Sequence, residues 1–289
     1  MLAFAQPVVD GLINGSIYAL VALGLTLAFG IARFANVAHG DFVTLGAYAA
    51  LWGVYGAGLG LVPAALVGLA ATVGAGLVAV GLVYRPLARR ARIASVIASI
   101  GVALVLRHAL IFVAGTQQFS FPIPIVRASD FLGVRITPKE LTILTVATLL
   151  MLALSVALQL TRVGKEMRAV ADDPALARVA GIRVDRVVTI MWMWSLALAA
   201  IAGMLLGVKT VVTPYMGWDM LLSAFAGAIL GGIGSPVGAV VGSLVIGVSE
   251  ELTTLVLPPA YRAGVAFLIM TAVLLVRPAG IFGARTAIR

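Results

Sequence analysis

The sequence predicts an all-α, polytopic transmembrane helix bundle with eight to ten spans, some of them broken or re-entrant. Of its 289 residues, 62% are hydrophobic and only 11% are charged, whereas a soluble domain of this size needs a charged surface to stay dispersed. The mean hydropathy is +1.13, and the apolar runs approach the ~20 residues that a helix needs to cross the hydrocarbon core. These runs are rich in Leu, Ala and Gly and exceed the ~10-residue alternating strands of a membrane β-barrel. One transmembrane domain is therefore expected over residues 1–289.

Nine apolar segments follow one another along the chain and define the expected spans. The first begins at Pro7, and because the first basic residue is Arg33, it lacks the basic flank of a cleaved signal peptide and is expected to remain as a span. Two segments, 31–40 and 231–238, are expected to be breaks inside the membrane rather than true loops. The expected spans are 8–30, 41–59, 62–84, 93–113, 141–160, 187–209, 219–234, 237–256 and 260–276.

The basic residues predict the orientation, because Lys and Arg in short loops favour the cytoplasm. If the spans alternate, the N-terminus lies outside and the C-terminus in the cytoplasm. The external segment, about 114–140, carries basic residues of its own, so the bias is imperfect. Topology explains the net charge of +9 better than nucleic acid does, and no nucleic-acid partner is expected. Three basic clusters fall on one side: Arg85, Arg89, Arg90 and Arg92; six residues from Arg162 to Arg186; and Arg277, Arg285 and Arg289.

Several chemistries have no recognisable motif in the chain. It contains no cysteine, which removes disulfides, thiolate metal sites and thiol catalysis. Neither an H-E-x-x-H metal pair nor a G-x-x-x-x-G-K-[ST] phosphate loop occurs. No metal or cofactor is therefore expected in this chain, and ATP, if it is used, must bind another chain. An enzyme is not expected, although a serine acting with His39 stays open.

Glycines spaced by four residues predict close helix packing, because small residues let helix backbones approach where lipid gives no hydrophobic drive. A surface that slides during a conformational change is the alternative interpretation. The glycines are Gly11 and Gly15, Gly203 and Gly207, Gly227 and Gly231, and Gly234, Gly238 and Gly242.

The segment about 161–186 contains a compact helix signal. Asp172 or Asp173 can cap a helix, Pro174 suits its first position, and Gly181 suits the position just past its end. The predicted helix, Pro174–Ala180, has about two turns, and an isolated helix this short is marginal in water. It is expected either to dock into a cytoplasmic partner or to rest on lipid headgroups, and the residues alone leave both open.

Motifs along nearly the whole chain carry a resemblance to one family. The sequence resembles the permease subunits of ABC importers of the branched-chain amino acid class, the LivH-like group. The family's commonest form near Asn36 has Phe where this chain has Val37. The motifs are NGSIYALVALGLTLAFG (14–30), NVAHGDFVTLGAY (36–48), VYRPLARR (83–90), GKEMRAVADDPALARVAGI (164–182), AFAGAILGGIGSPVGAVVGSLVIG (224–247) and VRPAGIFG (276–283).

The resemblance implies an importer in a bacterial inner membrane. This chain would form half of the translocation pathway, with a second permease subunit, a periplasmic solute-binding protein, and cytoplasmic ATPase subunits that bind ATP and magnesium. The implied solutes are branched-chain or other neutral amino acids, with urea or amides and aromatic carboxylates as alternatives. The segment 161–186 would couple the permease to the ATPases through Gly164, Arg168, Asp172, Asp173, Pro174, Ala177 and Gly181.

Polar residues at the two breaks are the first candidates for the pathway or gate. Ionisable groups at membrane depth are costly and tend to face the protein interior, and irregular backbone there must be buried or line a cavity. A broken helix at the second segment would resemble those at transporter binding sites. The alternative is a purely structural role, in which the side chain of His39 or Asp41 forms a hydrogen bond to loose backbone at the break. The candidates are Asn36, His39 and Asp41 at the first break, and Gly232, Gly234 and Ser235 at the second.

Arg107 completes the set of candidate pathway residues. It lies 14 residues beyond Ile93, or about 21 Å along a helix, in the outer third of the core. It is expected either to snorkel to the outer interface or to attract the carboxylate of a solute.

Two further expectations concern span ends: an interfacial aromatic belt formed by Trp192, Trp194, Tyr215 and Trp218, and solvated surface charges at Glu250 and Glu251.

One alternative function is an ion-coupled secondary carrier for a small organic anion, with Asp41 and His39 as a relay. Such a carrier would work as this chain alone, whereas an importer subunit would copurify with an ATPase.

Overall fold

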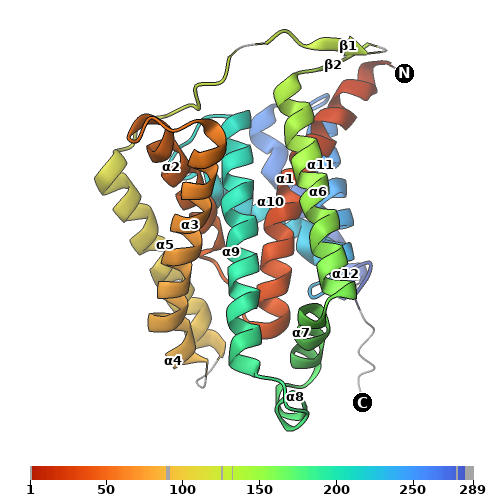
Figure 1. Ribbon diagram of the computed structural model, residues 1–289. Coiled ribbons are helices and arrows are strands. Elements are labelled where there is room, and N and C mark those ends of the chain that lie inside the picture. Colours follow the sequence, from red (N-terminus) through yellow and green to blue (C-terminus); the bar gives the residue numbers. More distant parts are fainter. Residues whose placement is uncertain (1, 89–91, 125, 132, 278, 284–289) are drawn as a thin grey trace.

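The computed structural model describes residues 2–88, 92–124, 126–131, 133–277 and 279–283. It is an upright bundle of helices with a small β-hairpin at one end (Figure 1), which confirms the predicted all-α membrane fold. Nine main helices correspond to the nine expected spans: α1 (Leu2–Ala32), α2 (His39–Tyr55), α3 (Leu61–Ala79), α5 (Arg92–Ala114), α6 (Pro138–Leu160), α9 (Val184–Lys209), α10 (Met216–Gly231), α11 (Pro236–Thr253) and α12 (Arg262–Val276).

Seven of these helical stretches are long and apolar enough to cross a membrane, when α12 is counted together with the short helical turn Pro259–Tyr261 before it. Helix α2 has 17 residues and α10 has 16. Helix α2 begins at the first predicted break and α10 ends at the second, so the broken-helix prediction is confirmed.

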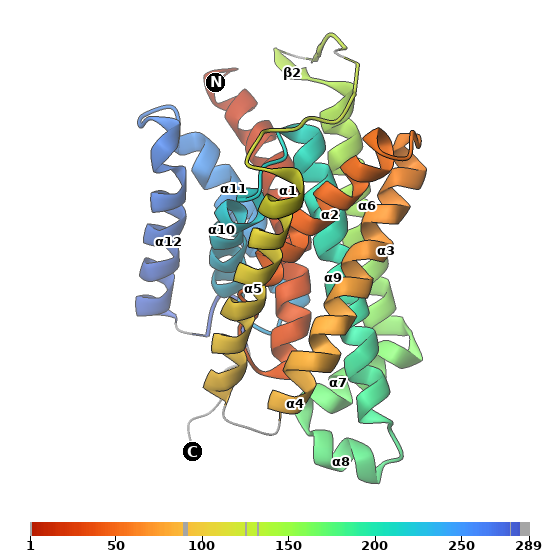
Figure 2. The ribbon, with the colours of Figure 1, turned by 90° about the vertical axis from the view of Figure 1, so that its left-hand side faces the viewer.

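The two ends of the bundle differ in charge and structure. The hairpin of β1 (Ser129–Phe131) and β2 (Val134–Ile136) lies at the end where α1 begins (Figure 1 and Figure 2). At the other end lie α4 (Arg85–Leu87), α7 (Arg162–Asp172) and α8 (Pro174–Val179) (Figure 1). We call these the hairpin end and the basic end. The basic end holds the described members of the arginine clusters, whereas Arg89, Arg90, Arg285 and Arg289 lie outside the described residues.

Helix α1 is the central element, and its packing against α11 explains one of the glycine pairs. It is buried over most of its middle, from Ile13 to Ala28. A Cβ atom on Gly11 would lie 2.5 Å from the Cα of Val248, and one on Gly15 would lie 2.9 Å from the Cα of Leu244. The two backbones are therefore in direct contact, and close packing at these glycines is confirmed.

Other predicted glycine contacts are also present. Gly227 and Gly242 pack α10 against α11, and Gly203 packs α9 against the backbone of Val43 in α2. Gly234 is different, because no atom would crowd a Cβ there and its φ is +95°. It serves a backbone turn and not helix packing.

Trp192 belongs to the core and not to an interfacial belt, so that prediction was wrong for this residue. Helix α3 continues through a π-helical turn, Val80–Tyr84, into α4. The Tyr84 ring stacks on Trp192 with centroids 5.2 Å apart, and Phe34 lies against both. The three rings close the bundle near the basic end.

Candidate functional site

The first break lies inside the bundle and brings Asn36, His39 and α2 into the core. After α1 the chain turns at Arg33, whose φ is +60°, and returns along the bundle. The Tyr84 hydroxyl donates to Asn36 Oδ1 at 3.0 Å, and Ser99 Oγ accepts from the Val37 amide at 3.1 Å. Side chains from α3–α4 and α5 thus satisfy part of the irregular backbone and its polar residues.

His39 begins α2 at the level of Gly24, where a Cβ would lie 2.8 Å from the imidazole. That level is eight residues, or about 12 Å, from the end of α1. The Val21 carbonyl lies near the ring, yet neither ring nitrogen forms a hydrogen bond of ordinary geometry within the described residues. The predicted bond from His39 to loose backbone is therefore not seen in this conformation. A buried polar group of this kind calls for an explanation.

Asp41 and Arg107 form a buried, bidentate ion pair between α2 and α5. Arg107 Nε lies 2.9 Å from Asp41 Oδ1, and Nη2 lies 3.0 Å from Oδ2. Asp41 is fully buried and Arg107 is 8% exposed. The guanidinium therefore turns inward instead of snorkelling to the outer interface. The sequence singled out both residues but not their pairing, because they lie 66 positions apart.

Two aromatic rings cover the Arg107 guanidinium from the start of α10. Its central carbon lies 4.7 Å from the ring centroid of Trp218 and 5.4 Å from that of Tyr215. Both distances suit a cation–π contact. About half of each aromatic side chain stays exposed, so these rings form the accessible side of the ion pair. This contact with a cation was not predicted, and their place in an interfacial belt stays a prediction.

The second break joins α10 to α11 and is closed by the chain's last described segment. Gly232 and Gly234 have φ values of +106° and +95°. Ser235 Oγ caps α11 by accepting from the Gly238 amide at 3.1 Å. The amides of Ile281 and Phe282 donate to the carbonyls of Leu230 and Gly231, each at 2.9 Å. Sequence reasoning missed this closure, although VRPAGIFG was one of the noted motifs.

Both breaks lie against α1, but their candidate residues meet it at different positions. His39 contacts Gly24, whereas Pro236 shares a pocket with Thr26. Among the described residues, no hydrogen bond joins the residues of one break to those of the other. The structure therefore does not merge the two sets of candidate residues into one site.

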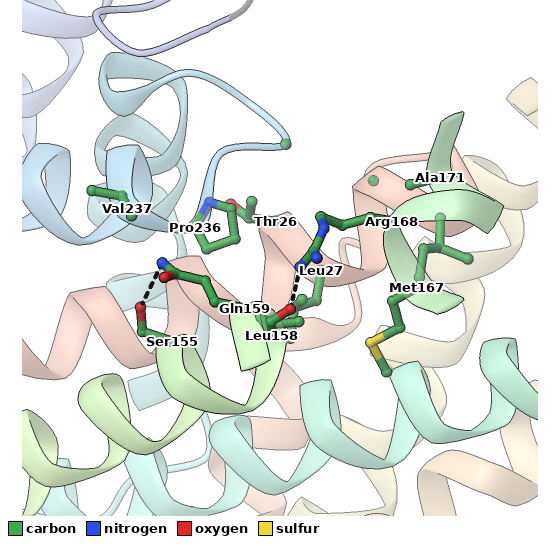
Figure 3. Close-up of a pocket in the computed structure, with 13 residues that line it drawn as sticks. Thr26, Leu27, Ser155, Leu158, Gln159, Met167, Arg168, Ala171, Pro236 and Val237 are labelled. Carbon is green, nitrogen blue, oxygen red and sulfur yellow. Dashed lines mark hydrogen bonds between the residues drawn. The ribbon is translucent and has the colours of Figure 1, made fainter. Parts of the chain in front are cut away.

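A pocket of about 210 Å³ at the basic end instead joins the second break to the predicted coupling segment (Figure 3). We call it the inner pocket. Its polar lining comes from Thr26 on α1, Ser155 and Gln159 on α6, and Arg168 on α7, and Gly234 and Pro236 close one side. Arg168 Nη1 also donates to the Leu158 carbonyl. Arg168 and Gly234, predicted for different roles, thus line the same cavity.

The coupling segment folds as two helices, of which only the second was predicted. Helix α7 is capped by Thr161, whose hydroxyl accepts from the Gly164 amide at 3.1 Å. A Cβ on Gly164 would collide with the backbone of Leu158, so this glycine allows α7 to fold back against α6. The signal that was missed is the helical spacing of Val163, Met167 and Val170, which face the bundle.

Helix α8 confirms the predicted helix and its caps. Asp173 Oδ1 accepts from the amides of Ala175 and Leu176 at 2.8 and 3.1 Å, whereas Asp172 ends α7 and is not the cap. Gly181 has a φ of +83° just past the end. Ala177 is buried, while Leu176 and Val179 are 66% and 86% exposed. The helix therefore presents an apolar tip at the basic end (Figure 1).

Glu250 and Glu251 are buried, so their prediction as solvated charges was wrong. Glu250 accepts from Tyr18 Oη at 2.9 Å and Ser223 Oγ at 2.5 Å. Glu251 accepts from Asn14 Nδ2 at 2.5 Å and Arg262 Nη2 at 2.8 Å. Four helices supply the donors and acceptors of this network: α1, α10, α11 and α12. It is a structural junction toward the hairpin end.

Comparisons with known proteins agree with the resemblance in the motifs. Residues 8–274 match the family described as branched-chain amino acid transport system, permease component. The chain is 34% identical, over 98% of its length and 96% of the relative, to the high-affinity branched-chain amino acid transport system permease protein LivH of Salmonella typhimurium strain LT2. It is 32% identical to BraD, of the same description, from Pseudomonas aeruginosa, over 97% of this chain and 96% of that protein.

A solved structure shares the fold. The structure titled PsaBC from Streptococcus pneumoniae in complex with Fab aligns with a TM-score of 0.53 over 95% of this chain and 91% of that chain, at 14% identity.

Proposed function

The chain belongs to the branched-chain amino acid transport permease family, and on that premise we propose that it forms half of the translocation pathway of an ATP-driven importer for branched-chain or other neutral amino acids. It is a multi-pass membrane transport subunit. The partners we propose are a second permease, cytoplasmic ATPase subunits that carry ATP and magnesium, and a periplasmic solute-binding protein. The basic end would face the cytoplasm of a bacterial cell and the N-terminus the outside.

The apolar tip of α8 is the observation that carries this proposal. Leu176 and Val179 lie three residues apart and share one exposed face. The caps at Asp173 and Gly181 hold the two turns in shape, which suits an apolar helix face that docks into a partner's groove. The helix extends beyond the ends of the long helices (Figure 1), which favours docking to a partner over resting on headgroups.

Alternating access would follow if ATPase movement is passed from α8 through α7 to the bundle. Helix α7 contacts α6, α9 and α1, and Arg168 meets the second break in the inner pocket. A shift of α8 would therefore reach both a long span and a discontinuous helix. Gly164, Arg168, Asp172, Asp173, Pro174, Ala177 and Gly181 are proposed as the coupling residues.

We propose that the Asp41–Arg107 pair is a gate in the part of the pathway nearer the hairpin end. An amino acid zwitterion carries one positive and one negative group, so it complements the separated partners of such a pair. Tyr215 and Trp218 hold the guanidinium from its accessible side and would contact an entering solute first. Asn36, His39, Gly232, Gly234 and Ser235 are proposed to move with the two breaks.

Affinity purification of the tagged chain from its native membrane tests the proposal. A stoichiometric ATPase and a second permease are expected to copurify. Val179→Asp should release the ATPase, whereas Val126→Asp, the same change at an exposed site on the external segment, should keep it. A lone chain that moves solute into liposomes without ATP would contradict the proposal and favour the ion-coupled carrier.

A further inference from the structure

The inner pocket continues into a second, apolar cavity that lies deeper along the bundle. This cavity has a volume of about 180 Å³, and Ser155, Pro236 and Val237 line both cavities. Together they form one groove between α1, α6 and α11. On α6 the lining runs from Met151 to Gln159, which spans about 12 Å at 1.5 Å per residue.

The groove has one polar and one apolar end. The deep half is lined by Leu23, Met151, Leu152, Leu154, Val240 and Val241 besides the shared residues. The half at the basic end carries Arg168 and Gln159 (Figure 3). The polarity of the groove thus changes in the same direction as that of one bilayer leaflet, from hydrocarbon to headgroup.

The polar half of the groove contains a buried hydroxyl without a partner. Thr26 is 3% exposed, and its Oγ1 has no hydrogen-bond partner among the described residues. Leaving a buried hydroxyl unbonded is costly, so a ligand oxygen that reached it on entering the pocket would gain a hydrogen bond. The Leu158 carbonyl accepts a hydrogen bond from one terminal nitrogen of the Arg168 guanidinium. Glu166 and Asp172 are the acidic neighbours on α7, and Glu166 pairs with Arg162.

The groove opens toward the bilayer and not only toward water. The neighbouring α6 residues Leu149, Leu152, Val156 and Leu160 are all exposed, as expected of a surface in contact with lipid chains. A ligand can therefore enter sideways from the membrane. This opening, the length of the groove and its apolar depth fit an acyl chain better than a compact amino acid.

We propose that this groove binds one anionic phospholipid of the cytoplasmic leaflet, with an acyl chain between α6 and α11 and the phosphate at Arg168. Basic pockets between helices on the cytoplasmic side are a known form of lipid recognition. The bound lipid would bridge α6–α7 to the second break, so that leaflet charge would influence coupling. The inference rests on the proposed orientation and goes beyond the proposed transport function.

Native mass spectrometry of the purified transporter complex, reconstituted with phosphatidylglycerol and phosphatidylcholine, tests the inference. The wild type is expected to retain phosphatidylglycerol in preference to phosphatidylcholine. Val237→Trp should remove one lipid per chain by filling the groove. Val245→Trp, at a comparably exposed site on the same helix, should leave the lipid count unchanged. Arg168→Gln should reduce the headgroup preference about fivefold, the contribution of one basic residue near an anionic surface.

The outcomes separate this inference from the proposed function. Lipid retention by Val237→Trp equal to that of the wild type would overturn the lipid site. A cross-link between a residue of the groove and the second permease would overturn it as well, because protein and not lipid would then cover the groove. Continued copurification of the ATPase with Val237→Trp would show that the complex is intact and that only the lipid was lost. If no ATPase copurified with the wild-type chain, the proposed function would be contradicted, while the count of bound lipid would be unaffected.

Discussion

Among single residues, Asp41 and Arg107 carry the largest consequence because both charges are withdrawn from water. Removing one partner of such a pair leaves the other charge uncompensated, whereas replacing both is far less harmful. The pair is also the point at which α2, α5 and α10 meet, through the aromatic rings over Arg107. Its energetic effect is therefore a test of the structure as well as of the gate.

We expect Asp41→Asn and Arg107→Gln each to destabilise the protein by about 3–5 kcal/mol. The double variant should recover a large part of this loss, since no unpaired charge remains. Thermal unfolding of the four proteins in one detergent gives the coupling energy of the double-mutant cycle. Additive effects would show that the two side chains do not form a pair.

Arg107→Gln also tests the solute-recognition role. In the reconstituted complex the half-saturation concentration for an amino acid should rise, because the variant lacks the guanidinium that faces the carboxylate. Arg262→Gln is the control, because it breaks the ion pair between Arg262 and the buried Glu251, which lies away from the gate. A half-saturation concentration that stays at the wild-type value would leave Arg107 with a structural role alone.

The sequence predicted single residues well where their role is local and poorly where it depends on distant partners. Gly181 was assigned as a cap, and the N-cap was narrowed to Asp172 or Asp173, from positions next to the helix itself. Glu250 and Glu251 were misplaced because their donors lie on other helices. A charge near a span end is compatible with either solvent or a buried junction, and only the packing of α1, α10 and α12 decides between them.

At the scale of helices, the backbone contact between α1 and α11 makes the glycines in it sensitive to substitution. An added methyl group at Gly15 meets main-chain atoms of Ser243 and Leu244 and not the end of a flexible side chain. Such atoms cannot move aside without displacing a helix. A helical glycine with open space around it, such as Gly74, has no such constraint and only lowers helix propensity.

Gly15→Ala should therefore lower the unfolding temperature, while Gly74→Ala should leave it unchanged or raise it. No atom lies within 4 Å of a Cβ built on Gly74, and replacing a helical glycine by alanine gains up to ~1 kcal/mol of helix propensity. The comparison needs only thermal unfolding in detergent. Equal effects of the two changes would contradict the close α1–α11 contact.

Helix α8 gives the second prediction at this scale. Pro174→Leu combined with Gly181→Val should uncouple ATP hydrolysis from uptake, because Val disfavours the positive φ of 83° that ends the helix. Gly181→Asn alone should retain coupling, since Asn tolerates that conformation. Both activities are measured in one proteoliposome preparation, and wild-type coupling in the double variant would remove this loop from the mechanism.

The positions of the helices were predictable because most of them consist of an apolar run that ends at a glycine, a proline or a charged residue. The breaks were found from Gly and polar residues inside such runs. Helix α7 was missed since it combines charged residues with only three inward apolar side chains. Its stability comes from packing against α6 and α9, which a short polar segment does not reveal alone.

For the whole molecule, the clear difference between the basic end and the hairpin end makes the orientation testable. The chain has no cysteine, so a single introduced cysteine is a clean reporter. In whole cells, an impermeant maleimide should label Val126→Cys and spare Arg162→Cys, and both should react after the cells are opened. Both native side chains are exposed, and the reverse pattern would invert the proposed topology.

The chain's last described segment has a consequence for biosynthesis. Leu230 and Gly231 end α10 with carbonyls that receive the amides of Ile281 and Phe282, and carbonyls without a partner are costly at membrane depth. Those donors lie 51 residues further along the chain than their acceptors and leave the ribosome after them. The end of α10 therefore stays unsealed until residues 281 and 282 have been made, and a chain that stops short of residue 280 exposes a recognisable defect to the membrane's quality-control proteases.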